Sequence, residues 1–97
     1  MQLKTRYYID AETGQPHMHR HGVSEAEAED VLRRPGEDRP GCADSRVALG
    51  QTRAGRYLRV IYLPDSEPGS VFVITAYELT GKPWRAFRRR MRRWRKP

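Results

Sequence analysis

The apolar residues of this chain are concentrated in one segment, and this segregation restricts the folds that are open to it. Eleven of its seventeen Val, Ile, Leu and Phe residues lie between Val47 and Leu79, in a chain of 97 residues. Seventeen such residues are fewer than the roughly 20% below which chains often stay disordered. A core can therefore form only where these residues gather, and we expect residues 47–79 to supply most of it.

Three strands are predicted in this segment. Residues 45–52 alternate between apolar and polar side chains, whereas 57–63 and 70–77 are nearly continuous apolar or aromatic runs. Gly55 stands in the short connection between the first two runs, where a tight hairpin needs a residue with positive φ. A longer polar loop, 64–69, joins the second run to the third. The expected arrangement is a three-stranded antiparallel meander.

The residues before the meander predict a helix and a short strand. Ser24 and Glu27 have the spacing of a capping box, acidic residues follow in the first turn, and Pro35 comes directly after the last periodic residue. These signals predict a helix over 24–34. A β-prone run at 6–9 predicts a short N-terminal strand, and residues 17–21 suggest a single helical turn. Residues 37–44 are charged and contain proline, so they are expected to form an exposed loop.

A second helix is predicted over 82–95. Pro83 lies near its first position, and Trp84, Phe87, Met91 and Trp94 fall within one arc of about 80° at 100° per residue. The fold class expected is therefore α+β, with an antiparallel sheet packed with an N-terminal helix and a basic C-terminal helix. The length fits one domain, 1–97, which would bury roughly 60% of its unfolded surface.

Charge is segregated as strongly as hydropathy. Residues 82–97 contain nine Lys and Arg and no acidic residue, whereas the first 81 residues have a net charge of −2. This asymmetry favours a polyanionic partner, with nucleic acid ahead of an acidic protein, and the alternative is a solvated basic helix without a partner. We find no apolar run of the roughly 20 residues that a membrane span needs, and no signal peptide. With Cys42 as the single cysteine, a cytoplasmic location is expected.

Three groups of residues could carry chemistry. Residues 17–21 contain three histidines in alternation, which is either a weak metal-binding pattern or a surface turn in which only His21 matters. Tyr77 and Glu78 end the last strand, where Glu78 could act as a base or pair with an arginine. The third group could bind phosphate, or form the outward polar face of the sheet. It consists of Arg46, Arg53, Arg56 and Arg59.

The order and spacing of several segments resemble the BrnT group, the toxins of bacterial type II toxin–antitoxin pairs, whose fold is related to RelE. The likeness runs from about Tyr8 to Arg93. It is carried by His21-Gly22-Val23-Ser24, by Arg46-x-Ala48-x-Gly50-x-Thr52-x-x-Gly55-Arg56-x-Leu58-x-Val60-x-Tyr62 and by Val73-Ile74-Thr75-Ala76. BrnT-like toxins tend to have arginine where this chain has Tyr77, so the chain resembles a divergent branch.

The resemblance implies a ribonuclease that inhibits translation, acts without metal or cofactor, and is neutralised by a small antitoxin encoded next to it. It carries over best to His21, Arg46, Arg53 and Arg56. In metal-free RNA cleavage Arg46 and Arg56 would bind the phosphate, and His21 or Glu78 would be the base. The residues expected to contact RNA are Arg53, Tyr77, Lys82, Arg85, Arg89 and Arg92. The alternatives are a binding module that breaks no bond and a metal-binding protein built on the histidines.

Overall fold

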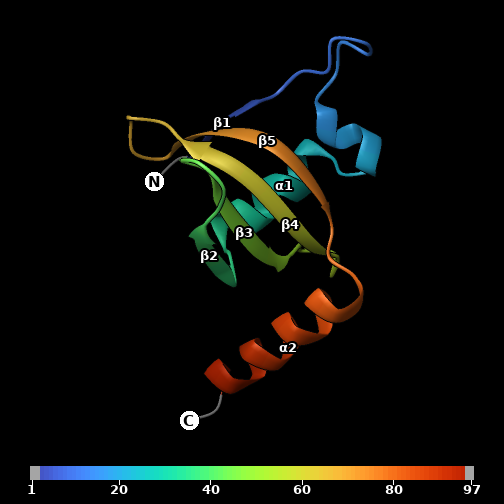
Figure 1. Cartoon of the computed structure of the whole chain (residues 1–97), viewed down its shortest axis with the longest axis vertical. Helices are drawn as coiled ribbons and strands as arrows, with labels where there is room; N and C mark the ends of the chain where they lie inside the picture. Colours follow the sequence, from blue (N-terminus) through green and yellow to red (C-terminus); the bar gives the residue numbers. More distant parts are fainter. Residues whose placement is uncertain (1–2, 96–97) are drawn as a thin grey trace.

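The computed structural model describes residues 3–95, which form a curved sheet with one helix against it and the C-terminal helix below its lower end (Figure 1). The elements in chain order are β1 (Lys4–Tyr7), the 3-10 helix η1 (His17–His21), α1 (Glu25–Arg33), β2 (Glu37–Pro40), β3 (Arg46–Gln51), β4 (Tyr57–Pro64), β5 (Ser70–Glu78) and α2 (Gly81–Arg95). The α+β class predicted from the sequence is confirmed.

The described strands form one mixed sheet of five strands in the order β1-β5-β4-β3-β2. The meander of β3, β4 and β5 is antiparallel, as expected from the sequence. The expectation of an antiparallel sheet, made of this meander and a possible short N-terminal strand, is correct in part. The sheet is mixed, because β1 pairs in parallel with β5, and β2 adds an unexpected strand on the other side of the meander.

Strand β2 corrects the expectation that 37–44 is a loop. Its residues pair with β3 in antiparallel register, from Glu37 opposite Leu49 to Pro40 opposite Arg46. A charged, proline-containing sequence gives little strand signal, but such residues are tolerated on the edge of a sheet, where one side of the backbone needs no partner. The edge position therefore explains both the strand and its unusual composition.

Strand β1 lies slightly before the run predicted at 6–9. It pairs with β5 from Lys4 opposite Ser70 to Tyr7 opposite Val73. A parallel partner so distant along the chain leaves no local trace in the sequence, so the register could not be predicted.

The local signals around α1 are confirmed. The Ser24 hydroxyl accepts a hydrogen bond from the Glu27 amide at 3.2 Å, and the Glu27 carboxylate accepts one from the Ser24 amide at 3.0 Å. The turn at 17–21 is the 3-10 helix η1, and Gly22 ends it in the left-handed conformation with φ of 71°. Gly55 has φ of 102° in the β3–β4 hairpin, as the turn requires.

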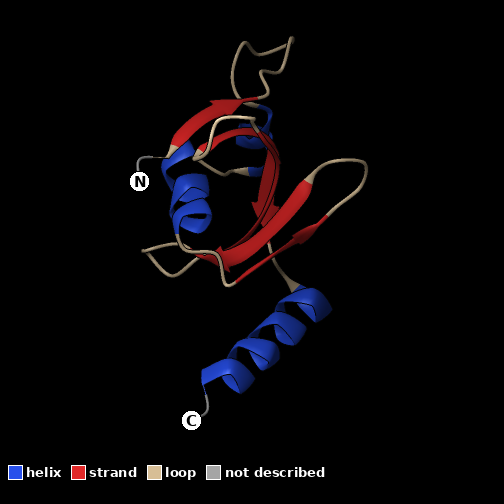
Figure 2. Ribbon diagram, turned by 90° about the vertical axis from the view of Figure 1, so that its left-hand side faces the viewer, coloured by secondary structure: helices blue, strands red, loops and turns tan. Residues whose placement is uncertain are grey.

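The sheet separates two apolar clusters. One face packs against α1 and η1 and buries Val31, Leu58 and Val60 completely. The sheet curves around α1, and α2 lies beyond its end (Figure 2). On the opposite face a smaller cluster forms between the sheet and α2, with Val47, Leu49, Leu79 and Phe87 buried.

Helix α2 docks through its aromatic side chains. Phe87 is only 2% exposed, and Trp84 and Met91 pack against the smaller cluster. The Tyr57 ring meets Trp84 and Phe87 edge-on, with centroid distances of 5.9 and 6.2 Å. The fourth member of the predicted stripe, Trp94, has its side chain outside the described residues. No helix in residues 3–95 is long and apolar enough to cross a membrane.

Candidate functional site

Four residues expected from the sequence to act in catalysis or RNA binding come together where η1, the β3–β4 hairpin and the end of β5 meet. The His21 and Tyr77 rings lie edge-on with centroids 5.8 Å apart. An Arg56 Nη lies 3.4 Å from a Glu78 carboxylate oxygen. His21, Arg56, Tyr77 and Glu78 thus form one corner of the molecule, although two of them are far from the others in sequence.

A row of rings leads into this corner. Tyr8, His17, His21 and Tyr77 follow one another with centroid distances of 6.1, 5.5 and 5.8 Å. His17 is hydrogen bonded to Asp10 at 3.3 Å, whereas the His21 imidazole makes no hydrogen bond with any residue in 3–95. Since His21 is also exposed, its nitrogens are open to a substrate.

Arg56 is already held by carboxylates. One Nη donates to both carboxylate oxygens of Glu27 at 3.1 Å and to the Gly22 carbonyl at 2.7 Å. The hydrogen bond to Glu27 is the main cause that raises the pKa of Arg56. With Glu78 nearby as well, the positive charge of Arg56 is balanced, and the side chain fastens the hairpin to the start of α1.

Arg46 lies away from the corner. Arg46 is the first residue of β3, and Arg56 follows the hairpin at the other end of this strand. The two ends of β3 are about 17 Å apart, at 3.3 Å per residue. The Arg46 Nε donates to Asp38 of β2 at 2.9 Å, and the same aspartate accepts from the Tyr62 hydroxyl at 2.5 Å. Burial and Asp38 raise the pKa of Tyr62 to about 12. The structure therefore does not bring Arg46 to the predicted catalytic group.

Arg59 was part of the arginine group found in the sequence, but no role was assigned to it. In the sheet it lies opposite Leu49 on one side and Tyr77 on the other, so these three residues share the face turned away from α1. Its Nε is buried and has no hydrogen-bond partner among the described residues, and its guanidinium joins no ion pair there. The signal in the sequence was an arginine at position 59, within the otherwise apolar and aromatic run 57–63.

A second unpartnered polar atom lies on the same face. Thr75 pairs with Ile61, one step along the face from the pairing of Tyr77 with Arg59. Its Oγ1 is buried and lacks a hydrogen-bond partner in residues 3–95. Native proteins leave few buried polar groups unpaired, because each one costs free energy. Two of the three such side-chain atoms among the described residues lie at neighbouring positions on this face, and the third is Thr5 Oγ1 in β1.

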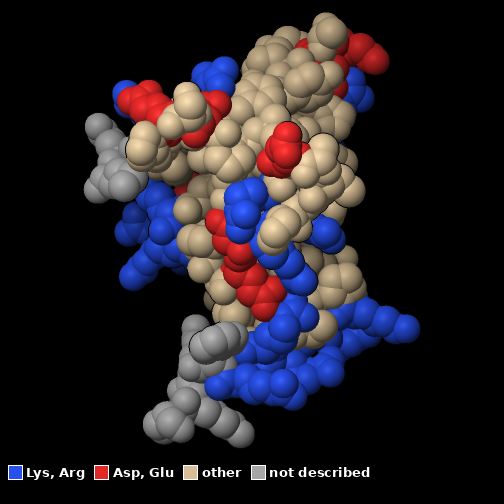
Figure 3. Space-filling view, turned by 60° about the vertical axis from the view of Figure 1, so that its left-hand side comes forward, with Lys and Arg blue, Asp and Glu red and all other residues tan. Residues whose placement is uncertain are grey.

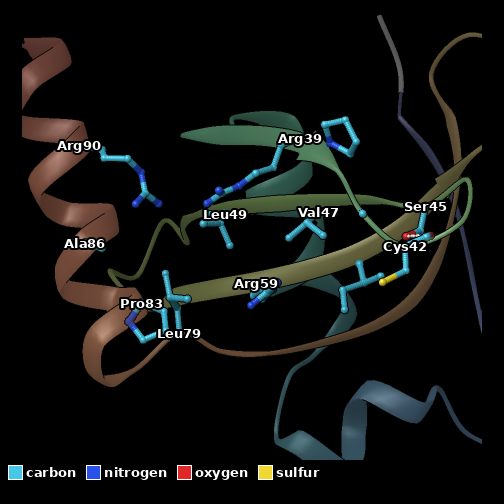
Figure 4. A pocket seen from close by; sticks show the side chains of 13 residues that line it. Arg39, Cys42, Ser45, Val47, Leu49, Arg59, Leu79, Pro83, Ala86 and Arg90 are labelled. Carbon is cyan, nitrogen blue, oxygen red and sulfur yellow. Dashed lines mark hydrogen bonds between the residues drawn. The ribbon is translucent and has the colours of Figure 1, made fainter.

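A pocket of about 640 Å³ opens on this face beside α2, and we call it the sheet pocket (Figure 4). Val47 and Leu49 form part of its floor, and Arg39, Arg59 and Arg90 bring positive charge to it. Glu37 accepts hydrogen bonds from Arg39 and Arg90, each at 2.9 Å, and the bond from Arg90 is the main cause that lowers the pKa of Glu37. Three arginines against one glutamate leave the pocket suited to an anion.

The other basic residues expected to bind RNA gather over α2, at the lower end of the molecule (Figure 3). They include Lys82, Arg85, Arg89 and Arg92, all exposed. None of these four forms an ion pair with a carboxylate in the described part of the chain. Arg53, in the hairpin, is likewise exposed, and its amide donates to Asp30 at 3.1 Å.

The histidine pattern does not assemble a metal site. His19 is hydrogen bonded to Gln15 and Glu25, at 2.9 and 2.6 Å. Across residues 3–95 no three His, Cys, Asp or Glu side chains are placed to hold a metal ion.

The fold and site define a small α+β protein with a basic C-terminal helix and, on adjoining elements, a tyrosine, a histidine and an arginine; within residues 3–95 the His21 imidazole and the Arg59 guanidinium have no partner. The chain belongs to the family described as Domain of unknown function (DUF4258), whose model matches residues 14–78. This match covers the elements from η1 to β5, so it includes His21, Arg59 and Tyr77, while α2 lies outside it. No curated protein and no solved structure matches the chain.

Proposed function

We propose that the chain cleaves single-stranded RNA without a metal ion, using His21, Arg59 and Tyr77. The observation that carries the proposal is the charge state of the arginines. Arg46 and Arg56 are neutralised by carboxylates, whereas Arg59 is unpaired and lies opposite Tyr77, whose ring packs on the unbonded imidazole of His21. Tyr77 thus lies between Arg59, its partner across the two strands, and His21, whose ring it contacts.

In the proposed reaction His21 takes the proton of a ribose 2′-hydroxyl. The 2′-oxygen then forms a bond to the adjacent phosphorus, and the bond from phosphorus to the 5′-oxygen breaks. The leaving 5′-oxygen takes a proton from water. The products are a 2′,3′-cyclic phosphate and a 5′-hydroxyl end.

Each of the three residues has a separate role. Imidazole accepts a proton readily near neutral pH, which suits His21 as the general base. The Arg59 guanidinium stabilises the negative charge that develops on the phosphate oxygens, and more strongly where water is excluded. Tyr77 positions the His21 ring and stacks on a base of the RNA, while Lys82, Arg85 and Arg89 of α2 hold the phosphates of the flanking chain. Glu78 and Arg56 support the corner as an ion pair.

The test is cleavage of an unstructured RNA oligonucleotide in the presence of EDTA, beside a DNA oligonucleotide of the same sequence. We expect the RNA to be cut to 2′,3′-cyclic phosphate ends and the DNA to stay intact, because DNA lacks the 2′-hydroxyl. His21→Asn and Arg59→Met should each slow cleavage by about a hundredfold or more.

His19→Asn and Arg6→Gln are the matched controls, since both side chains are exposed and are held by carboxylates on other parts of the surface. The proposal fails if the wild type leaves RNA intact, if it cuts DNA equally well, or if the controls lose as much activity as the two test variants.

Binding without cleavage is the second candidate, and it is favoured by the carboxylates that occupy Arg46 and Arg56. A chain of this kind would retain RNA in a salt-dependent manner and release no cyclic phosphate.

In either case we propose that the chain acts as a toxin held inactive by a small protein encoded next to it. Induction in a bacterial host should then arrest growth, and co-expression of the neighbouring gene should restore it.

A further inference from the structure

A second pocket, about 520 Å³ in volume, lies on the other side of α2 from the sheet pocket. The end of α1, the β3–β4 hairpin and α2 enclose it, and we call it the hairpin pocket. A volume of this size matches the range of small-ligand sites, 300–1,000 Å³. It is large enough for one nucleotide.

The walls of the hairpin pocket are strongly basic. Four guanidinium groups line it, and Asp30 is its one acidic residue. These arginines are Arg34, Arg53, Arg88 and Arg92. None of the four side chains forms an ion pair with a carboxylate in residues 3–95. Asp30 itself accepts a hydrogen bond from the Arg53 amide, which keeps the hairpin close to α1.

Three different elements supply these arginines, so the charge converges on one cavity. Arg34 caps the end of α1, Arg53 lies in the hairpin, and Arg88 and Arg92 come from α2. A solvated basic helix would spread its charge outward, whereas here a separate helix and a hairpin turn contribute to the same cavity. Convergent guanidinium groups suit a ligand with several negative charges close together, because each can form a forked hydrogen bond with phosphate oxygens.

The inner wall of the pocket is aromatic and closely packed. Tyr57 and Phe87 line it, with backbone from Gly36 and Gly50. The Arg88 guanidinium lies over the Trp84 ring, 4.9 Å from its centroid, and this stacking holds the side chain in place at the rim. A flat ring next to convergent guanidinium groups fits the base and the phosphates of a nucleotide.

From these contacts we infer that the hairpin pocket binds the polyphosphate of a nucleotide, either free or at the 5′ end of an RNA chain. An internal phosphodiester carries one negative charge per residue of RNA, whereas a triphosphate concentrates several charges in the space that four arginines surround. The inference concerns residues other than His21, Arg59 and Tyr77, so it stands whether or not the chain cleaves RNA.

The test uses fluorescence of Trp84 in a Trp94→Phe background, where it is the single tryptophan, because Trp84 packs on both Tyr57 and Arg88. ATP and GTP should change its emission in a saturable manner, and adenosine and guanosine should not. Arg34→Gln combined with Arg92→Gln should raise the Kd for ATP and GTP by about tenfold or more.

The control is the double variant Arg33→Gln/Arg93→Gln, which removes the same charge from the neighbouring positions of α1 and α2 but leaves the pocket lining intact. Circular dichroism checks that both double variants are folded. Equal loss of affinity in the control would mean that only net charge matters, and this result would overturn the inference. Two other results would also overturn it: no change in the emission of the wild type at millimolar ATP or GTP, and equal binding of adenosine and guanosine.

Two RNA probes of one sequence distinguish the source of the polyphosphate. If RNA with a 5′-triphosphate competes with ATP and RNA with a 5′-hydroxyl does not, the pocket accepts chain ends as well as free nucleotides. If neither RNA competes while ATP binds, the ligand is a free nucleotide. Equal competition by both RNAs would contradict the inference, since the pocket would then bind internal phosphates.

Discussion

Gly36 and Phe87 are in such close contact that a single methyl group would separate α2 from the sheet. A Cβ atom at Gly36 would lie 2.7 Å from Cζ of Phe87 and 2.9 Å from the Met91 sulfur. Phe87 is buried between the helix and the sheet, and at so short a distance either its ring or the helix would have to shift. The absence of a side chain at this one position therefore sets how closely the basic helix approaches the body.

Gly36→Ala should loosen the docking of α2 and lower the free energy of unfolding by about 1–3 kcal/mol, the usual cost of overpacking. Urea denaturation measures the loss. In the Trp94→Phe background, Trp84 emission should shift toward that of an exposed tryptophan. In a Phe87→Leu background, which removes the ring atoms nearest to Gly36, the same substitution should cost much less. Equal costs in both backgrounds would show that the contact with Phe87 is not the cause.

Arg59→Met should separate activity from stability. The substitution keeps most of the volume of the side chain but removes a buried Nε that has no partner. We expect the stability to stay unchanged or to rise by about 1 kcal/mol, because an unsatisfied polar group is lost. RNA cleavage should fall at the same time. Parallel loss of both, measured by thermal unfolding and cleavage, would assign Arg59 a structural role.

Arg56→Gln should instead reduce stability by about 1–2 kcal/mol, because it removes charge-assisted hydrogen bonds between the hairpin and α1. Glu27→Gln should have a similar effect. If the ion pair is the cause, the two substitutions together should cost less than the sum of the single losses. Urea denaturation of the three variants completes the cycle, and strict additivity would argue against the pair.

Acid should weaken the docking of α2 through Glu37. Its pKa lies below the ordinary value of 4.5, chiefly because Arg90 donates a hydrogen bond to it. The stabilisation is present above pH 4.5 and is lost as the pH falls through the lowered pKa in the folded protein. Trp84 emission in the Trp94→Phe background, followed from pH 6 to pH 2, should report this loss. At pH 6 the emission of the Glu37→Gln variant should resemble that of the unsubstituted protein in acid. If the variant keeps the same pH profile, protonation of Glu37 is not the cause of the change.

The local features of the fold could be predicted because each depends on neighbouring residues. The capping box at Ser24, the helical turn at 17–21 and the hairpin at Gly55 require only a short stretch of sequence. The apolar stripe of α2 was also visible, and Phe87 and Trp84 occupy it as expected. These elements account for the class of the fold.

The site was harder to predict because it depends on which charges are already paired. Arg46 looked available because residues 37–44 were expected to form a loop, and the strand β2 that they contain brings Asp38 to it. Arg59 looked like one of several surface arginines until the register placed it between Leu49 and Tyr77. Pairing across strands decides both cases, and no spacing within a single segment contains that information.

The parallel pairing of β1 with β5 has a consequence for the order in which the protein is made. Residues 4–7 are synthesised first, yet their partners are residues 70–73. At a rate of synthesis of 5–20 residues per second, on the order of several seconds pass between the synthesis of β1 and that of β5. The antiparallel strands β2 to β5 can join in the order of their synthesis, so the first strand translated completes the sheet last.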